Sequence, residues 1–256
     1  MNRLRFAFPL LTLVILLSAT DQLLAQKLRI AVAANAQGLI KKLQADFKKR
    51  TGIESEVIIG ASGKLTTQIM NGAPYEIFLS ADTEFPEKLY NDGFGVSKTK
   101  IYALGSLIVC GQFSRNIKDW QSLLKSGKIN KIAIANPKTA PYGRAAEESL
   151  SFYQLDKIVQ SKLVFGESIS QVNSYIQTGV VGLGFTTEAF LYETASQSKL
   201  NWVRVDSKSY RKIEQGVILL SFAKKTGLER AQKFYDYLSS AAAKKIIRSS
   251  GYHLPE

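Results

Sequence analysis

The chain has 256 residues and a formal net charge of +13 at pH 7, with one cysteine and one histidine. A disulfide within one chain is therefore excluded, and a Cys–His pair, a Ser-His-Asp triad or a histidine-rich metal site is disfavoured. The charge favours anionic partners, but the lysines are scattered singly or in pairs, as on a solvated surface, so we expect no nucleic-acid partner.

The N-terminus, residues 1–25, has the pattern of a secretory signal peptide. Arg3 and Arg5 precede an apolar stretch at 6–19, and a cleavage site follows at Ala25. The alternative is a membrane anchor, but the stretch is shorter than the roughly 20 residues that a spanning helix needs. No later segment is long and apolar enough to span, so we expect a soluble, periplasmic mature protein.

The first half of the mature chain alternates strand-like and helix-like runs. A helix is indicated by apolar residues at helical spacing from Leu39, and Gly52 is expected to end it. Asp82 is expected to cap another helix. The predicted strands lie at 28–32, 57–59 and 77–79, and the predicted helices at 39–51, at 65–71 and after Asp82.

A second α/β series begins at the apolar run 102–110, which we interpret as one long strand leaving the first domain. This alternation predicts parallel sheets with right-handed crossovers. We expect an α/β protein of two lobes, 26–104 plus 212–256 and 105–211, with hinges near 103–106 and 210–216. The later strands are predicted at 132–135, 163–165, 180–185, 202–205 and 217–222, and the helices at 143–153, 169–177, 188–196, 227–239 and 240–249.

Four loops join a strand-like run to a helix-like run and carry small hydroxyl or amide residues, with Glu167 as their only acid. They are 33–36, 60–63, 140–143 and 166–170. Unpaired N–H groups and the positive end of the dipole make helix N-termini suitable for anions. Because ligands of open α/β sheets bind beyond the carboxyl ends of the strands, we expect these loops to meet around a small oxyanion.

Other interpretations of these residues remain open. Asn35 and Ser62 are residue types that commonly cap helices without binding anything. Lys64 could reach an anion or extend into solvent, and the spacing around it does not fit a nucleotide-binding P-loop. Eleven tyrosines raise the alternative of iron(III) binding, but none is paired with an evident carboxylate or histidine ligand set.

Four segments together resemble the periplasmic molybdate-binding proteins of ABC importers. They are 31–35 (AVAAN), 60–64 (GASGK), 72–82 (GAPYEIFLSAD) and 137–143 (PKTAPYG). The resemblance covers about residues 27–254, and the segment 72–82 is its most specific part. It implies a two-lobed periplasmic-binding-protein fold of type II, with an oxyanion held between the lobes.

The resemblance also implies which residues bind the oxyanion. Asn35 stands where many relatives have serine, and Phe185 stands where a tyrosine hydroxyl is often supplied. We hypothesise that Tyr142 replaces that hydroxyl. The implied ligand-binding residues are Ala34, Asn35, Ser62 and Gly63 in the first lobe, and Tyr142, Gly143, Ile169 and Phe185 in the second.

We therefore expect a monomeric periplasmic receptor that binds molybdate, and tungstate with it, and delivers it to an inner-membrane ABC permease. No cofactor, no catalysis and no direct protein ligand to molybdenum are expected. The alternatives are a receptor for sulfate, phosphate or iron(III), and a secreted enzyme acting on phosphate or sulfate esters. The enzyme alternative lacks an evident nucleophile–base pair.

Overall fold

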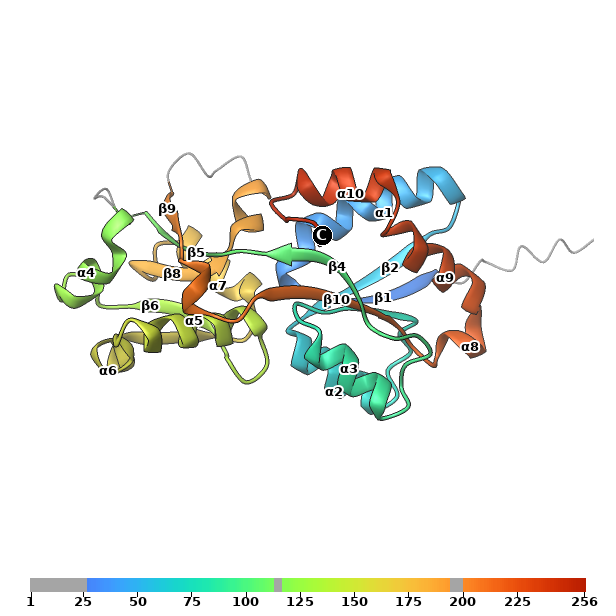
Figure 1. The fold of residues 1–256 in the computed structure, drawn as a ribbon, viewed down its shortest axis with the longest axis horizontal. Coiled ribbons are helices and arrows are strands. Elements are labelled where there is room, and N and C mark those ends of the chain that lie inside the picture. The colour runs from blue at the N-terminus through green and yellow to red at the C-terminus, as the bar shows by residue number, and fades with distance from the viewer. Residues whose placement is uncertain (1–26, 113–116, 194–199) are drawn as a thin grey trace, which may run out of the picture.

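A computed structural model describes residues 27–112, 117–193 and 200–256, so the predicted signal peptide lies outside the described residues. The chain forms two lobes side by side, each built on a five-stranded sheet (Figure 1). Lobe I denotes the part built on the first sheet, and lobe II the part built on the second. Within the described residues, no helix is long and apolar enough to cross a membrane.

Lobe I is a mixed sheet with helices on both faces. Its strand order is β2 (Ser55–Gly60), β1 (Leu28–Ala33), β3 (Ile77–Leu79), β10 (Ile213–Leu219), β4 (Lys100–Gly105). In Figure 1, α1 (Gln37–Thr51) and α10 (Ala241–Arg248) lie on one face, and α2 (Ser62–Met70) and α3 (Glu84–Asn91) on the other. The remaining helices are η1 (Ala34–Ala36), α8 (Ala223–Thr226) and α9 (Leu228–Tyr237).

Lobe II repeats this plan around a separate core. Its strand order is β7 (Leu163–Gly166), β6 (Ile132–Ala135), β8 (Leu183–Thr187), β5 (Leu107–Gly111), β9 (Asn201–Arg204). Its α-helices are α4 (Trp120–Lys125), α5 (Pro141–Phe152), α6 (Asp156–Val159) and α7 (Ile169–Gln177), and its 3-10 helices are η2 (Ile117–Asp119), η3 (Gln160–Lys162), η4 (Glu188–Tyr192) and η6 (Ser207–Ser209).

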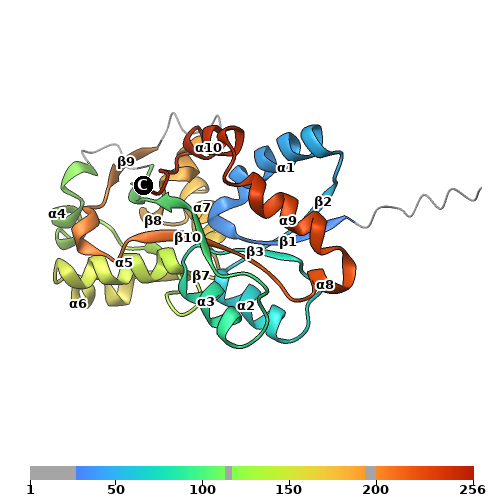
Figure 2. The same ribbon diagram turned by 45° about the vertical axis from the view of Figure 1, so that its right-hand side comes forward.

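The chain crosses between the sheets twice, and the crossings lie beside each other. Only Ser106 separates β4 in lobe I from β5 in lobe II. The chain returns from β9 through η6 into β10, whose first residue, Ile213, pairs with Gly105. Both views show β4 and β10 passing together between the lobes (Figures 1 and 2).

Most predicted elements are confirmed, and the strand at 77–79 and the helix at 169–177 have the predicted bounds. Three expectations are wrong. The apolar run 102–110 is two strands in different sheets, because the chain leaves lobe I at Ser106. Neither sheet is purely parallel, since β10 and β5 are antiparallel to their neighbours. The segment from Glu188 forms a short 3-10 helix rather than an α-helix.

Candidate functional site

The small cavity between the lobes collects the strand-to-helix loops. It measures about 10 Å³, which is room for about one water molecule. It therefore has to widen before a tetrahedral oxyanion can enter. Among the described residues, those lining it include no acidic or basic side chain; they are Ala33, Ala34, Asn35, Ala61, Ser62, Ala81, Ala140, Pro141, Tyr142 and Ile169.

Three α-helices begin at the cavity, which explains why backbone donors gather here. Ser62, Tyr142 and Ile169 lie in the first turns of α2, α5 and α7, where N–H groups have no acceptor within the helix. Among the described residues, these three N–H groups also have no hydrogen-bond acceptor outside their helices. Pro141 at the start of α5 has no N–H to satisfy and fixes the backbone for the helix. The cavity thus offers converging N–H groups and helix dipoles to an anion.

Ser62 is buried, with 1% of its surface exposed, and its hydroxyl has a fixed role. Its Oγ accepts a hydrogen bond from the Ala81 N–H at 3.0 Å. The hydroxyl hydrogen can therefore be donated to a ligand. The capping alternative is wrong for Ser62, because Ala61 is the N-cap of α2 and no side chain caps that helix.

Asn35 lines the cavity, but its amide group does not offer donors to it. The two hydrogens of Nδ2 go to Gln215 Oε1 at 2.8 Å and to the Tyr252 hydroxyl at 3.0 Å. This differs from the expectation that the amide donates to the anion. Asn35 also caps no helix, because Ala36 is the N-cap of α1 and has no side-chain bond.

Tyr142 is 1% exposed and lines the cavity. Its hydroxyl accepts a hydrogen bond from Thr187 Oγ1 at 3.0 Å. Burial raises the pKa of Tyr142, so the phenol stays protonated at neutral pH and can donate. Its oxygen packs against Gly105 at the first crossing, where a Cβ added to the glycine would lie only 2.0 Å away.

Gly63 and Gly143 do not line the cavity. The Gly63 N–H donates to Thr139 O across the lobes at 2.9 Å, and a Cβ on Gly63 would lie 3.0 Å from the Thr139 Cα. The Gly143 N–H donates to Ala140 O, and a Cβ there would lie 2.2 Å from Ala135 O. Both glycines therefore allow backbones to approach each other closely.

Phe185 also lies away from the cavity. It sits on β8 with 1% of its surface exposed, and its ring meets Trp120 edge-on at 5.3 Å between centroids. This differs from the expectation that Phe185 and Tyr142 address the same anion. The structure instead places Phe185 in the apolar core of lobe II, so Ala34, Asn35, Ser62, Tyr142 and Ile169 are the predicted residues that come together.

Sequence reasoning missed one lining residue outside the predicted loops and two residues directly behind the lining. Ala81 was not among the implied ligand-binding residues, although it lines the cavity and its N–H donates to Ser62. Gln215 and Tyr252 contact Asn35 from 180 and 217 residues away. Because they are so far from Asn35 along the chain, no local sequence pattern indicated these contacts. The alanine-rich run 31–36 was a usable signal for close backbone approach.

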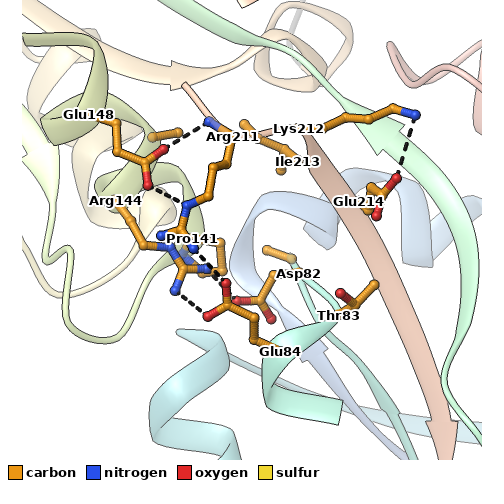
Figure 3. Close-up of a pocket in the computed structure, with 12 residues that line it drawn as sticks. Asp82, Thr83, Glu84, Pro141, Arg144, Glu148, Arg211, Lys212, Ile213 and Glu214 are labelled. Atoms are coloured by element: carbon orange, nitrogen blue, oxygen red, sulfur yellow. Dashed lines mark hydrogen bonds and ion pairs between the residues drawn. The ribbon is translucent and has the colours of Figure 1, made fainter. Parts of the chain in front are cut away.

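A larger pocket of about 200 Å³ lies next to the cavity and carries charges of both signs (Figure 3). Arg144 of α5 bridges Asp82 and Glu84 of lobe I, at 2.8 Å each. Arg211 joins Glu84 at 2.9 Å and Glu148 at 2.6 Å. Because these charges pair with one another across the lobes, this pocket connects the lobes and is less suited to an anion.

Two further contacts join the lobes near the cavity. Lys64 Nζ lies 2.5 Å from Glu167 Oε1, so Lys64 pairs across the lobes and does not line the cavity. Ser170 Oγ donates to Gln37 Oε1 at 3.0 Å. With the Gly63–Thr139 bond, these contacts hold the helix N-termini of the two lobes against each other.

The family of the chain follows from comparison with known proteins. The model of the family described as bacterial extracellular solute-binding protein matches residues 28–253. The chain belongs to this family. Its cavity is lined by residues of both lobes, which agrees with that assignment.

Named relatives of this solute-binding protein cover nearly all of it. It is 35% identical to the molybdate-binding protein ModA of Azotobacter vinelandii, over 90% of this chain and 91% of the relative. It is 36% identical to ModA of Rhodobacter capsulatus, over 87% and 86%. The solved periplasmic molybdate-binding protein of Azotobacter vinelandii superposes with a TM-score of 0.84 at 31% identity, over 90% of this chain and all of that one.

The donor set of this solute-binding protein suits an oxyanion better than a bare cation. N–H and O–H groups donate, whereas hard cations need oxygen ligands that accept. Within the described residues, no group of three or more His, Cys, Asp or Glu side chains is placed to hold a metal ion. It is the donor set that favours an oxyanion over iron(III).

Proposed function

We propose that this protein is a periplasmic receptor that binds molybdate, and tungstate with it, and delivers it to an inner-membrane ABC permease. The observation that carries the proposal is the cavity between the lobes, into which three helix N-termini with unused N–H groups converge. The named relatives, molybdate-binding proteins over about 90% of the chain, support the choice of ligand.

Neutral donors can hold a dianion because fixed N–H and O–H dipoles replace its lost hydration. In our proposal the donors are the backbone N–H groups of Ser62, Tyr142 and Ile169, with the hydroxyls of Ser62 and Tyr142. Ala34 and Asn35 contribute the backbone of η1. Hydrogen phosphate carries a proton for which the cavity has no charged acceptor, so the site discriminates against it.

The proposal also covers the assembly, the export and the opening of the protein. The receptor acts as a monomer without a cofactor and without catalysis, and a signal peptide at 1–25 directs it to the periplasm. The proposed boundaries of the lobes, 26–104 plus 212–256 and 105–211, fall at the two crossings, and the lobes open there. Opening provides the extra volume that the anion needs.

Isothermal titration of the purified mature chain tests the proposal. Molybdate and tungstate should bind with one site per chain, while sulfate and phosphate at the same concentrations give little heat. Iron(III) citrate serves as the cation control. Tight phosphate or iron(III) binding without a response to molybdate would contradict the proposal, and hydrolysis of a phosphate or sulfate ester would favour the enzyme alternative.

A further inference from the structure

The polar residues behind the cavity form one continuous chain of hydrogen bonds. The Ala81 N–H donates to Ser62 Oγ at 3.0 Å, and the Ala81 carbonyl accepts from Gln215 Nε2 at 3.3 Å. Gln215 Oε1 accepts from Asn35 Nδ2, which also donates to the Tyr252 hydroxyl. The Tyr252 hydroxyl donates back to the Asn35 carbonyl at 2.7 Å. All four side chains in this chain are buried, with at most 3% exposed.

The direction of every bond in the chain is fixed by its two ends. The carbonyls of Ala81 and Asn35 can only accept. Gln215 must therefore present Nε2 to Ala81, which leaves Oε1 as an acceptor facing Asn35. The Tyr252 hydroxyl gives its hydrogen to the Asn35 carbonyl, so it can only accept from the Asn35 amide. Because both groups accept, both must face the Nδ2 donor of Asn35. A flipped Asn35 amide would lose both hydrogen bonds.

Gln215 lies beside an irregularity in the pairing of β10 with β4. The pairing of β10 with β4 shifts register between Gln215 and Gly216. A Cβ on Gly216 would lie 2.7 Å from Asp82 O, so glycine lets the strand approach the segment after β3. Gln215 lies next to the second crossing and bonds two cavity segments at once, η1 and Ala81.

We infer that Gln215 and Tyr252 are positioning residues of the anion site. They hold η1 and the Ala81 peptide in place, so that the backbone of η1 faces the cavity and the Ser62 hydroxyl hydrogen is left for the ligand. Neither residue lines the cavity. The inference rests on the proposed function, since it concerns the same site.

The chain offers a matched control for Tyr252. Tyr102 on β4 is as buried as Tyr252, at 4% against 3% exposed. Its hydroxyl has no hydrogen-bond partner among the described residues. Tyr102→Phe and Tyr252→Phe therefore remove the same atom from equally buried rings, and only the second removal breaks the chain of bonds.

The test is isothermal titration with sodium molybdate, combined with thermal unfolding, on wild type, Tyr252→Phe and Tyr102→Phe. We expect Tyr252→Phe to weaken binding about three- to tenfold, the effect of roughly one net hydrogen bond, and Tyr102→Phe to bind like wild type. The effect of Tyr252→Phe should be smaller in an Asn35→Ala background, because part of its action passes through the Asn35 amide.

A second variant, Gln215→Met, keeps the length of the side chain and removes both of its bonds. We expect weaker molybdate binding and an effect that is not additive with Ser62→Ala. Wild-type affinity in both Tyr252→Phe and Gln215→Met would overturn the inference alone. Equal losses of molybdate affinity in Tyr102→Phe and Tyr252→Phe would also overturn it, because a general effect on the fold would then explain both losses. Full additivity of Tyr252→Phe with Asn35→Ala would overturn it as well. Failure of the wild type to bind molybdate would instead overturn the proposed function and the inference with it.

Discussion

The Arg144 guanidinium of lobe II lies 2.8 Å from Asp82 Oδ2 of lobe I, with the two side chains 26% and 10% exposed. Burial raises the pKa of the Asp82 carboxyl, while the Phe85 N–H, Ser80 and Arg144 act in the opposite direction. Arg144 stands two residues after Tyr142 on the same helix, so this ion pair forms only when the cavity residues of the two lobes are together. Closure around the ligand and formation of the pair are therefore linked.

We predict that Arg144→Gln weakens molybdate binding by about 1–2 kcal/mol, mainly through faster release. The magnitude lies between that of exposed ion pairs and that of buried charged hydrogen bonds. Stopped-flow kinetics at low and high salt measures it. The control is Lys88→Gln, which removes the Lys88–Asp92 pair at the C-terminal end of α3, a pair that lies within lobe I. An unchanged release rate at low salt would contradict the prediction.

Ser62→Ala should reduce both affinity and stability. The affinity loss is about 1.5–3 kcal/mol, because the hydroxyl donates to a charged ligand in the proposed site. The stability loss is about 1–3 kcal/mol, because the buried Ala81 N–H loses its acceptor. Titration and chemical denaturation measure the two separately. A stability loss without any affinity loss would show that Ser62 serves only to satisfy Ala81.

The structure changes the expectation for Tyr142 and Phe185. Tyr142→Phe should weaken molybdate binding by about 1.5–3 kcal/mol if its hydroxyl meets the anion. Phe185→Tyr should not restore the loss, because the new hydroxyl would be buried in the lobe II core near Trp120. It should destabilise the fold by about 1–3 kcal/mol. Recovery of affinity in the double variant, measured by titration, would place Phe185 at the site after all.

The sequence predicted the parts of the site that depend on local pattern. A helix N-terminus after a short apolar strand is visible because the spacing of apolar residues changes from that of a strand to that of a helix. Small residues at those junctions indicated where two backbone segments approach each other. This was sufficient to predict that the loops 33–36, 60–63, 140–143 and 166–170 meet. The resemblance then implied the individual residues, of which Ala34, Asn35, Ser62, Tyr142 and Ile169 do line the cavity.

The rest depended on contacts between distant residues. The role of Asn35 is determined by Gln215 and Tyr252, and Gln215 lies at a register shift between β10 and β4 that no local pattern predicts. The sequence did not show that one strand ends and another begins at Ser106, because apolar residues lie on both sides of it. The two strands are told apart only by the sheets that they join. Phe185 was assigned by resemblance, and the neighbouring Trp120 places it in the core.

Cys110 is predicted to report unfolding. It is fully buried, and burial raises the pKa of its thiol from 9.0 to about 12. The folded state therefore keeps its proton where the unfolded state loses it, and the contribution of Cys110 to stability falls as pH rises from 9.0 towards 12. At about pH 8, a thiol reagent should react only through opening of the fold. Fast reaction of the native protein would contradict the burial.

Gly105→Ala is predicted to impair the site from the first crossing. A Cβ at this position would lie 2.0 Å from the Tyr142 hydroxyl oxygen and 3.1 Å from Gln215 Nε2, so Tyr142 has to move. We expect molybdate affinity to fall by more than tenfold, because Tyr142 lines the cavity, and stability to fall by about 1–3 kcal/mol from overpacking.

The double variant Gly105→Ala/Tyr142→Phe separates this clash from a general effect on the crossing. Removing the hydroxyl removes the closest contact and leaves the ring carbon at 3.0 Å, so most of the lost stability should return. Affinity should rise only to the level of Tyr142→Phe alone, because the donor is still missing. Thermal unfolding and titration of the two single variants and the double variant measure both quantities. A double variant as unstable as Gly105→Ala would mean that the crossing itself, and not Tyr142, requires glycine.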